Sequence, residues 1–205
     1  MTPYLFSFVF PFLLMMVCLQ GIAALPGFKS KGPTPTFVLA SVSALAVAIP
    51  VFGLPLGRWI ISLNANFSIL LLALVFNRIA GTAFHMRPLD PKALNACALF
   101  SLISGVILYP MALGLGPYDP YGAGWGFSWL FAGVLACTIL LVIMKNRFGV
   151  VLFLAILAYD LGLLESSNFW DYLIDPFVVI WAAIRLAWPR LFNRIRFQGK
   201  GKKML

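Results

Sequence analysis

Four carboxylates lie close together near the C-terminal end of the chain and are its clearest candidates for chemistry. Asp160 and Glu165 flank one short polar break, and Asp171 and Asp175 follow it. Asp171 and Asp175 are four residues apart, so they share a face if one helix carries both. Carboxylates at this density could bind a divalent cation, hold a proton or supply an acid–base pair.

A structural explanation competes with this chemical one. Asn168 followed by Asp171 resembles a helix N-cap with its acidic third residue, and acids in a first turn favour the helix dipole. Asp160 escapes that explanation, because it is expected at the C-terminal end of a helix, where an acid is unfavourable. Arg58 is the one base expected on the same side and is the candidate to neutralise Asp160. Both explanations stay open.

The segment 114–126, GLGPYDPYGAGWG, is the second candidate site. Its side chains include Tyr118, Asp119, Tyr121 and Trp125. Aromatic residues are common where a membrane protein meets the headgroups, which is one interpretation. The other is that the segment presents aromatic faces and a carboxylate to a ligand or partner, such as a sugar ring or a cationic headgroup.

The sequence predicts no metal centre and no cofactor. His85 is the only histidine, and Cys18, Cys97 and Cys137 are isolated within apolar segments. The spacings HExxH, GxSxG and CxxC and the phosphate-binding GxxxxGK[ST] do not occur. We therefore assign no catalytic residue.

Long apolar segments carry these residues. Hydrophobic residues make up 62% of the 205 residues, and charged residues 10%. A membrane-spanning helix needs about 20 mainly apolar residues, and suitable segments lie at residues 4–25, 36–56, 60–80, 93–115, 127–144, 148–164 and 169–188. The sequence predicts an all-α, polytopic transmembrane bundle of about seven spans. The count falls to five or six if the second or third segment does not cross; Pro50 and Pro55 should kink or unwind the outer end of the second.

The charges between these segments alternate in sign. Bases fill the first, third and fifth breaks and the C-terminal tail, at Lys29, Lys31, Arg87, Lys92, Lys145, Arg147, Arg190, Arg194, Arg196, Lys200, Lys202 and Lys203. Five of the six acids lie in or beside the fourth and sixth breaks. Because cytoplasmic loops carry the excess of Lys and Arg, we expect the N-terminus outside and the C-terminus in the cytoplasm.

The formal charge of +9 is concentrated after the last apolar segment. We expect a transmembrane domain at residues 1–188 and a basic juxtamembrane tail at residues 189–205. Such a tail contacts anionic lipid headgroups, so we expect a bilayer partner and no nucleic acid.

The sequence favours a small multi-pass protein of a bacterial cytoplasmic (inner) membrane. We expect a non-catalytic accessory or interaction subunit of cell-envelope biogenesis that binds another membrane protein. Two alternatives stay open. One is a small transporter or channel that uses Asp160, and the other is a membrane enzyme acting on a lipid or lipid-linked substrate at the outer leaflet.

Overall fold

The computed structural model describes residues 2–23, 33–64 and 66–187, and in this part the chain is mostly helical. The elements are α1 (Thr2–Ala23), α2 (Pro33–Ala48), β1 (Pro50–Val51), β2 (Leu54–Pro55), α3 (Leu56–Leu63), α4 (Ile69–Ala83), α5 (Pro91–Ala112), the 3-10 helix η1 (Pro120–Gly124), α6 (Trp129–Ile143), α7 (Phe148–Asp160) and α8 (Phe169–Leu173). A final apolar helix follows at Pro176–Ala187. The all-α fold class is confirmed. The basic tail of residues 189–205 and the bases of the first break lie outside the described residues.

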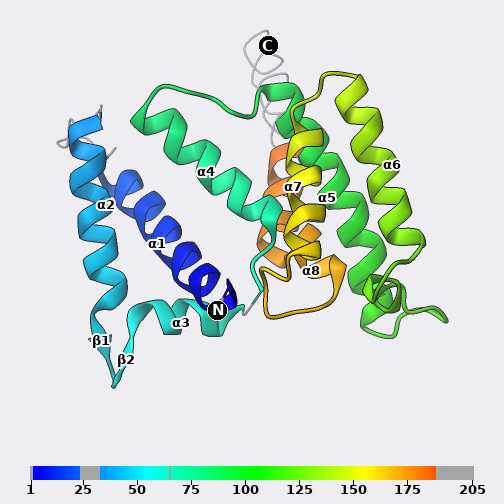
Figure 1. Ribbon diagram of the computed structural model, residues 1–205, viewed down its shortest axis with the longest axis horizontal. Coiled ribbons are helices and arrows are strands. Elements are labelled where there is room, and N and C mark those ends of the chain that lie inside the picture. Colours follow the sequence, from blue (N-terminus) through cyan, green and yellow to red (C-terminus); the bar gives the residue numbers. More distant parts are fainter. Residues whose placement is uncertain (1, 24–32, 65, 188–205) are drawn as a thin grey trace, which may run out of the picture.

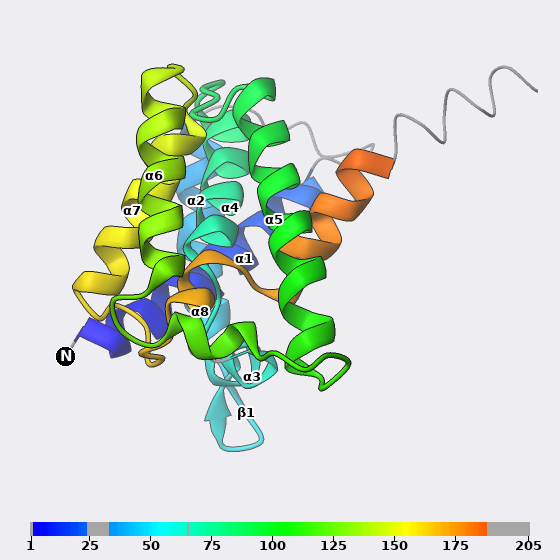
Figure 2. The ribbon, with the colours of Figure 1, turned by 90° about the vertical axis from the view of Figure 1, so that its right-hand side faces the viewer.

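The longer helices run alternately up and down between two ends of the molecule (Figure 1). One end carries the turns 84–90 and 144–147, with their bases, and we call it the basic end. The other carries the segments 49–68, 113–128 and 161–175, and we call it the loop end (Figures 1 and 2). The short helices α3, η1 and α8 all lie at the loop end.

The second predicted segment ends early, in a β-hairpin. α2 stops at Ala48, and β1 pairs antiparallel with β2. Phe52 and Gly53 form the turn with φ angles of 50° and 83°, as a tight two-residue hairpin turn requires. Trp59 Nε1 donates to the Val51 carbonyl at 2.9 Å and ties the hairpin to α3. The expected unwinding at this end is confirmed.

Two other predicted segments were wrong in their limits. Residues 60–80 do not form one helix, because α3 ends at Leu63 and α4 begins only after Ser68, whose hydroxyl accepts from Leu71 N at 3.1 Å. Residues 169–188 also divide: α8 ends at Leu173, and a new helix starts at Pro176. Proline cannot supply the N–H that an uninterrupted helix would need there, whereas it fits a first helical position.

The helices also differ in length from the prediction. Among the described residues, α5 is the one helix long and apolar enough by itself to cross a bilayer. Its 22 residues extend about 33 Å. The apolar helices α2, α4, α6 and α7 and the final helix are shorter and have 10–17 residues.

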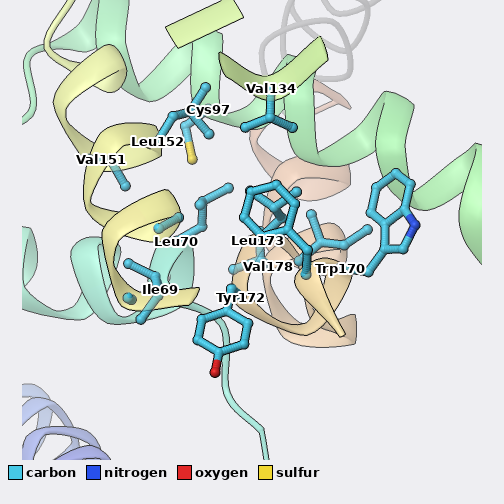
Figure 3. Packing of buried hydrophobic residues seen from close by; sticks show 14 of the residues in the cluster. Ile69, Leu70, Cys97, Val134, Val151, Leu152, Trp170, Tyr172, Leu173 and Val178 are labelled. Atoms are coloured by element: carbon cyan, nitrogen blue, oxygen red, sulfur yellow. The ribbon is translucent and has the colours of Figure 1, made fainter. Parts of the chain in front are cut away.

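The principal core is built from side chains of α4, α5, α6, α7, α8 and the final helix. Figure 3 shows Leu70, Leu152, Leu173 and Val178 pointing toward one another, and these four side chains have no exposed surface. Small residues allow the close approach of the backbones. A Cβ on Gly105 of α5, for example, would lie 2.6 Å from a methyl carbon of Val179 in the final helix. Large apolar side chains on α5, α6 and α7 point away from this core and are exposed.

Candidate functional site

Two side chains of the segment 161–175 fasten the loop 114–128 to the loop end. Asn168 is fully buried and donates from Nδ2 to the Tyr121 carbonyl at 3.0 Å, while its Oδ1 caps α8 by accepting from Trp170 N. Trp170 Nε1 donates to the Pro120 carbonyl at 2.8 Å. Gly124 lies so close to the Asn168 amide that a Cβ there would overlap it. η1 is therefore held against α8 by side-chain hydrogen bonds and close packing.

The segment 64–68 joins the same assembly. Asn66 Oδ1 accepts from Ser166 N at 3.1 Å. The Tyr172 hydroxyl accepts from Leu164 N and donates to the Ser166 carbonyl, both at 3.1 Å; it points away from the apolar core in Figure 3. Three segments far apart in sequence thus form one hydrogen-bonded unit, which we call the loop cluster (residues 64, 66–68, 114–128 and 161–175).

Asp175 connects the starts of two helices. It is 2% exposed. One carboxylate oxygen accepts from Ser68 N at 2.9 Å and from Ser68 Oγ at 2.7 Å, and the other accepts from Val178 N at 2.9 Å. Ser68 caps α4, and Asp175 itself caps the final helix. The partial positive charge at the two helix starts stabilises the buried carboxylate, and no basic side chain of residues 2–23, 33–64 or 66–187 forms an ion pair with it.

A polar cavity of about 180 Å³ lies within the loop cluster, against α5. Its polar lining residues are Asn64, Asn66, Tyr109, Tyr121, Asp171 and Asp175. The Tyr121 hydroxyl donates to Asp171 Oδ2 at 3.0 Å. In the described part of the chain, the lining includes two carboxylates and no basic side chain, so the cavity favours a cation or a proton over an anion.

The Tyr121 hydroxyl should ionise at an unusually high pH in this cavity. Burial and the neighbouring Asp171 carboxylate raise the pKa of Tyr121 to about 12, against about 10 for tyrosine in an unfolded chain. The folded state therefore binds this proton more tightly. The resulting stabilisation is complete below pH 10 and is lost as the pH rises from about 10 to about 12.

Melting of the detergent-solubilised protein across this pH range tests the assignment. We expect Tyr121→Phe to lose less stability than the wild type between pH 10 and 12, because it lacks the group that titrates. Tyr118→Phe is the matched control, since Tyr118 is 51% exposed, and should follow the wild type. Identical alkaline profiles for Tyr121→Phe and the wild type would show that Tyr121 is not shielded.

The four candidate carboxylates divide into two pairs. Asp171 and Asp175 line the cavity, whereas Asp160 and Glu165 are exposed. The prediction that Asp171 and Asp175 share a face of one helix was wrong, because α8 ends at Leu173 and the chain is extended at Ile174. They meet at the cavity because the chain breaks between them.

The other predicted site residues lie at the loop end with different surroundings. Arg58 is exposed on α3, and no ion pair joins it to Asp160 within the described part of the chain. Asp119 caps η1 by accepting from Tyr121 N at 2.9 Å. Tyr118 and Trp125 are exposed, while Tyr121 turns inward to the cavity.

Sequence reasoning missed three residues of this site. Asn64 and Asn66 lie within the segment 60–80, which the sequence predicts as one helix, and Tyr109 lies within the predicted span 93–115. The spacing Asn64-x-Asn66-x-Ser68 was the available signal, because Asn and Ser favour turns and N-caps over helix interiors. No sequence pattern indicates that Tyr109 of α5 lines this cavity.

Comparisons of the chain with protein-family models, curated proteins and solved structures give no match. Across residues 2–23, 33–64 and 66–187, no group of three or more His, Cys, Asp or Glu side chains is placed to hold a metal ion. The function is therefore inferred from the chain itself.

Proposed function

We propose that the chain crosses a bacterial cytoplasmic membrane seven times and serves as a non-catalytic interaction subunit of cell-envelope biogenesis. The loop cluster is its docking face outside the cytoplasm, and another membrane protein is its partner. The seven crossings would be α1, α2, α4, α5, α6, α7 and the final helix. The short helix α3 would lie along the outer surface. The N-terminus would be outside and the C-terminus inside.

The distribution of side chains supports the membrane part of this proposal. Large apolar residues such as Ile103, Val106, Ile139 and Phe153 are at least half exposed on the long helices. Large exposed apolar side chains on several helices are expected where a protein meets a membrane or another protein. Small residues, including Ala98 and Ala155, are buried between helices, as in membrane bundles, where they permit close packing.

The observation that carries the docking function is a set of exposed aromatic residues on a fixed backbone. Trp125, Phe127 and Trp129 are 55%, 84% and 60% exposed. The backbone beneath them is held by Asn168, and Ser128 Oγ donates to the Ala123 carbonyl. Rigid, exposed aromatic side chains lose little conformational entropy on binding and are enriched among the residues that dominate interface energetics.

Site-specific photo-crosslinking tests the docking function. A photoreactive phenylalanine analogue at Phe127 should crosslink one membrane protein in a fixed ratio, whereas the same analogue at Phe153 on α7 should crosslink lipid. Trp125→Ala should lower recovery of that partner at least about tenfold, as expected for a central interface residue. Recovery of lipid adducts alone from Phe127, or equal partner recovery with Trp125→Ala, would contradict the docking function.

The cavity supports a second candidate, a small cation transporter or channel. This candidate was linked to Asp160, but Asp160 is exposed and does not line the cavity. Asp171 is the better residue, because its second carboxylate oxygen accepts no hydrogen bond from the described residues. Cation uptake into proteoliposomes should then be abolished by Asp171→Asn and unchanged by Glu165→Gln. No uptake of sodium, potassium or protons by the wild type would dismiss this candidate.

A further inference from the structure

An apolar groove opens between α4 and α7 near the basic end. Its volume is about 470 Å³, and α1 contributes Val9 and Leu13 to its lining. Figure 1 shows α4 and α7 diverging toward the basic end, with the segment 84–90 passing above them. The groove is therefore lined mainly by apolar side chains and reaches the basic end of the molecule at Arg147.

Among the described residues that line the groove, Arg147 is the one with a charged side chain, and it is exposed. Its Nη1 donates to the carbonyls of Arg87 and Pro88 at 3.0 and 3.2 Å, which fixes the guanidinium at the groove. Within the described residues, Nε and Nη2 donate to no acceptor, and no carboxylate forms an ion pair with Arg147. The guanidinium is therefore positioned and retains free donors for an anion.

We propose that this groove holds an acyl chain of one anionic phospholipid from the cytoplasmic leaflet, with Arg147 contacting its phosphate. The inference depends on the membrane embedding and orientation proposed above. The argument for this occupant is complementarity: the lining is apolar except at the basic end, where a phosphate-binding side chain lies. Arg suits phosphate because its planar guanidinium can donate two parallel hydrogen bonds.

The charge of Arg147 should make the site selective among lipids with the same chains. Native mass spectrometry of the delipidated full-length protein, titrated with phosphatidylglycerol or phosphatidylcholine, measures this selectivity. We expect Arg147→Gln to weaken phosphatidylglycerol binding about fivefold, the effect of one base near an anionic surface, and to weaken phosphatidylcholine binding less, because the choline cation offsets the charge of its phosphate. Arg147→Lys retains the charge and should preserve most of the preference. Arg78→Gln, an exposed base of α4 outside the groove lining, should match the wild type.

The position of the acyl chain needs a separate measurement. A phosphatidylglycerol with a photoreactive diazirine in its acyl chain should label peptides containing residues 69–76 and 150–154. Ala73→Phe adds bulk inside the groove and should reduce that labelling, whereas Ala136→Phe makes the same change on the exposed face of α6 and should not.

Three results would overturn the inference: equal affinity of wild type and Arg147→Gln for phosphatidylglycerol, uniform labelling of all exposed helices, or labelling of the groove that Ala73→Phe does not reduce. These results would leave the proposed function standing if the protein is found in the membrane fraction with the expected topology. Absence from the membrane fraction would instead remove the proposed function and this inference together.

Discussion

Asp175→Ala should lower the free energy of unfolding by about 3 kcal/mol or more, because it leaves several buried donors unpaired. The carboxylate accepts from Ser68 N, Ser68 Oγ and Val178 N. All three lose their acceptor at once. For a chain of this length the expected drop in melting temperature is roughly 6–12 °C, measured as loss of the monodisperse peak after heating in detergent.

Asp175→Asn separates the two roles of this carboxylate. The amide oxygen can still accept from Val178 N and cap the final helix, but the amide nitrogen would face the Ser68 donors. We therefore expect a loss intermediate between the wild type and Asp175→Ala. Glu165→Ala, a change at an exposed acid, should stay within about 0.5 kcal/mol of the wild type. If Asp175→Ala has the same melting temperature as Glu165→Ala, the bridge between the two helix starts does not stabilise the fold.

Gly124→Ala should destabilise the loop cluster by about 3 kcal/mol. The new methyl group would overlap the Asn168 amide. Moving that amide breaks its hydrogen bonds to the Tyr121 carbonyl and Trp170 N. Gly122→Ala is the matched control in the same loop, because no atom of the described residues lies within 4 Å of its added Cβ. The melting temperature and the yield of the crosslink from Phe127 should both fall in Gly124→Ala and stay unchanged in Gly122→Ala.

A double variant tests whether the Asn168 contact causes this effect. Glycine is tolerated at N-cap positions at a cost of only a few tenths of a kcal/mol, and Asn168→Gly removes the atoms that Gly124→Ala would strike. The double variant should therefore lose clearly less free energy of unfolding than the two single variants lose in sum. Additive losses would mean that the added methyl group destabilises the loop for another reason.

The sequence predicted the helical class and most helix positions because apolar segments are long and their breaks are strongly marked. The limits of α5, α6 and α7 lie within a few residues of the predicted segments. The errors arose where apolar composition continues through a break in the backbone. Residues 169–188 stay apolar around Asp175, so hydropathy alone does not show that the helix stops.

A local sequence signal marks three of the helix starts. Asp-Pro pairs occur at Asp90, Asp119 and Asp175, and each aspartate accepts a hydrogen bond from a backbone N–H of the helix that follows. An aspartate N-cap followed by proline at the first helical position is a strong helix start. Read in this way, half of the six acids have capping roles.

The candidate site was only partly predictable, because its parts come from distant segments. The sequence identified Asp171, Asp175 and Tyr121 but could not show that they share one cavity. Hydrogen bonds that join residues 47 to 107 positions apart bring them together. The other candidate acids, Asp160 and Glu165, are close to them in sequence but do not line the cavity.

Cysteine accessibility in intact cells tests the central claim most directly, because the docking face and the lipid groove both depend on orientation. In a background with Cys18, Cys97 and Cys137 replaced, Ser167→Cys reports on the loop cluster and Met86→Cys on the basic end; both positions are exposed. A membrane-impermeant thiol reagent should label Ser167→Cys in intact spheroplasts and Met86→Cys only after lysis. Labelling of Met86→Cys from outside, or protection of Ser167→Cys until lysis, would contradict the proposed topology and the role assigned to the loop cluster.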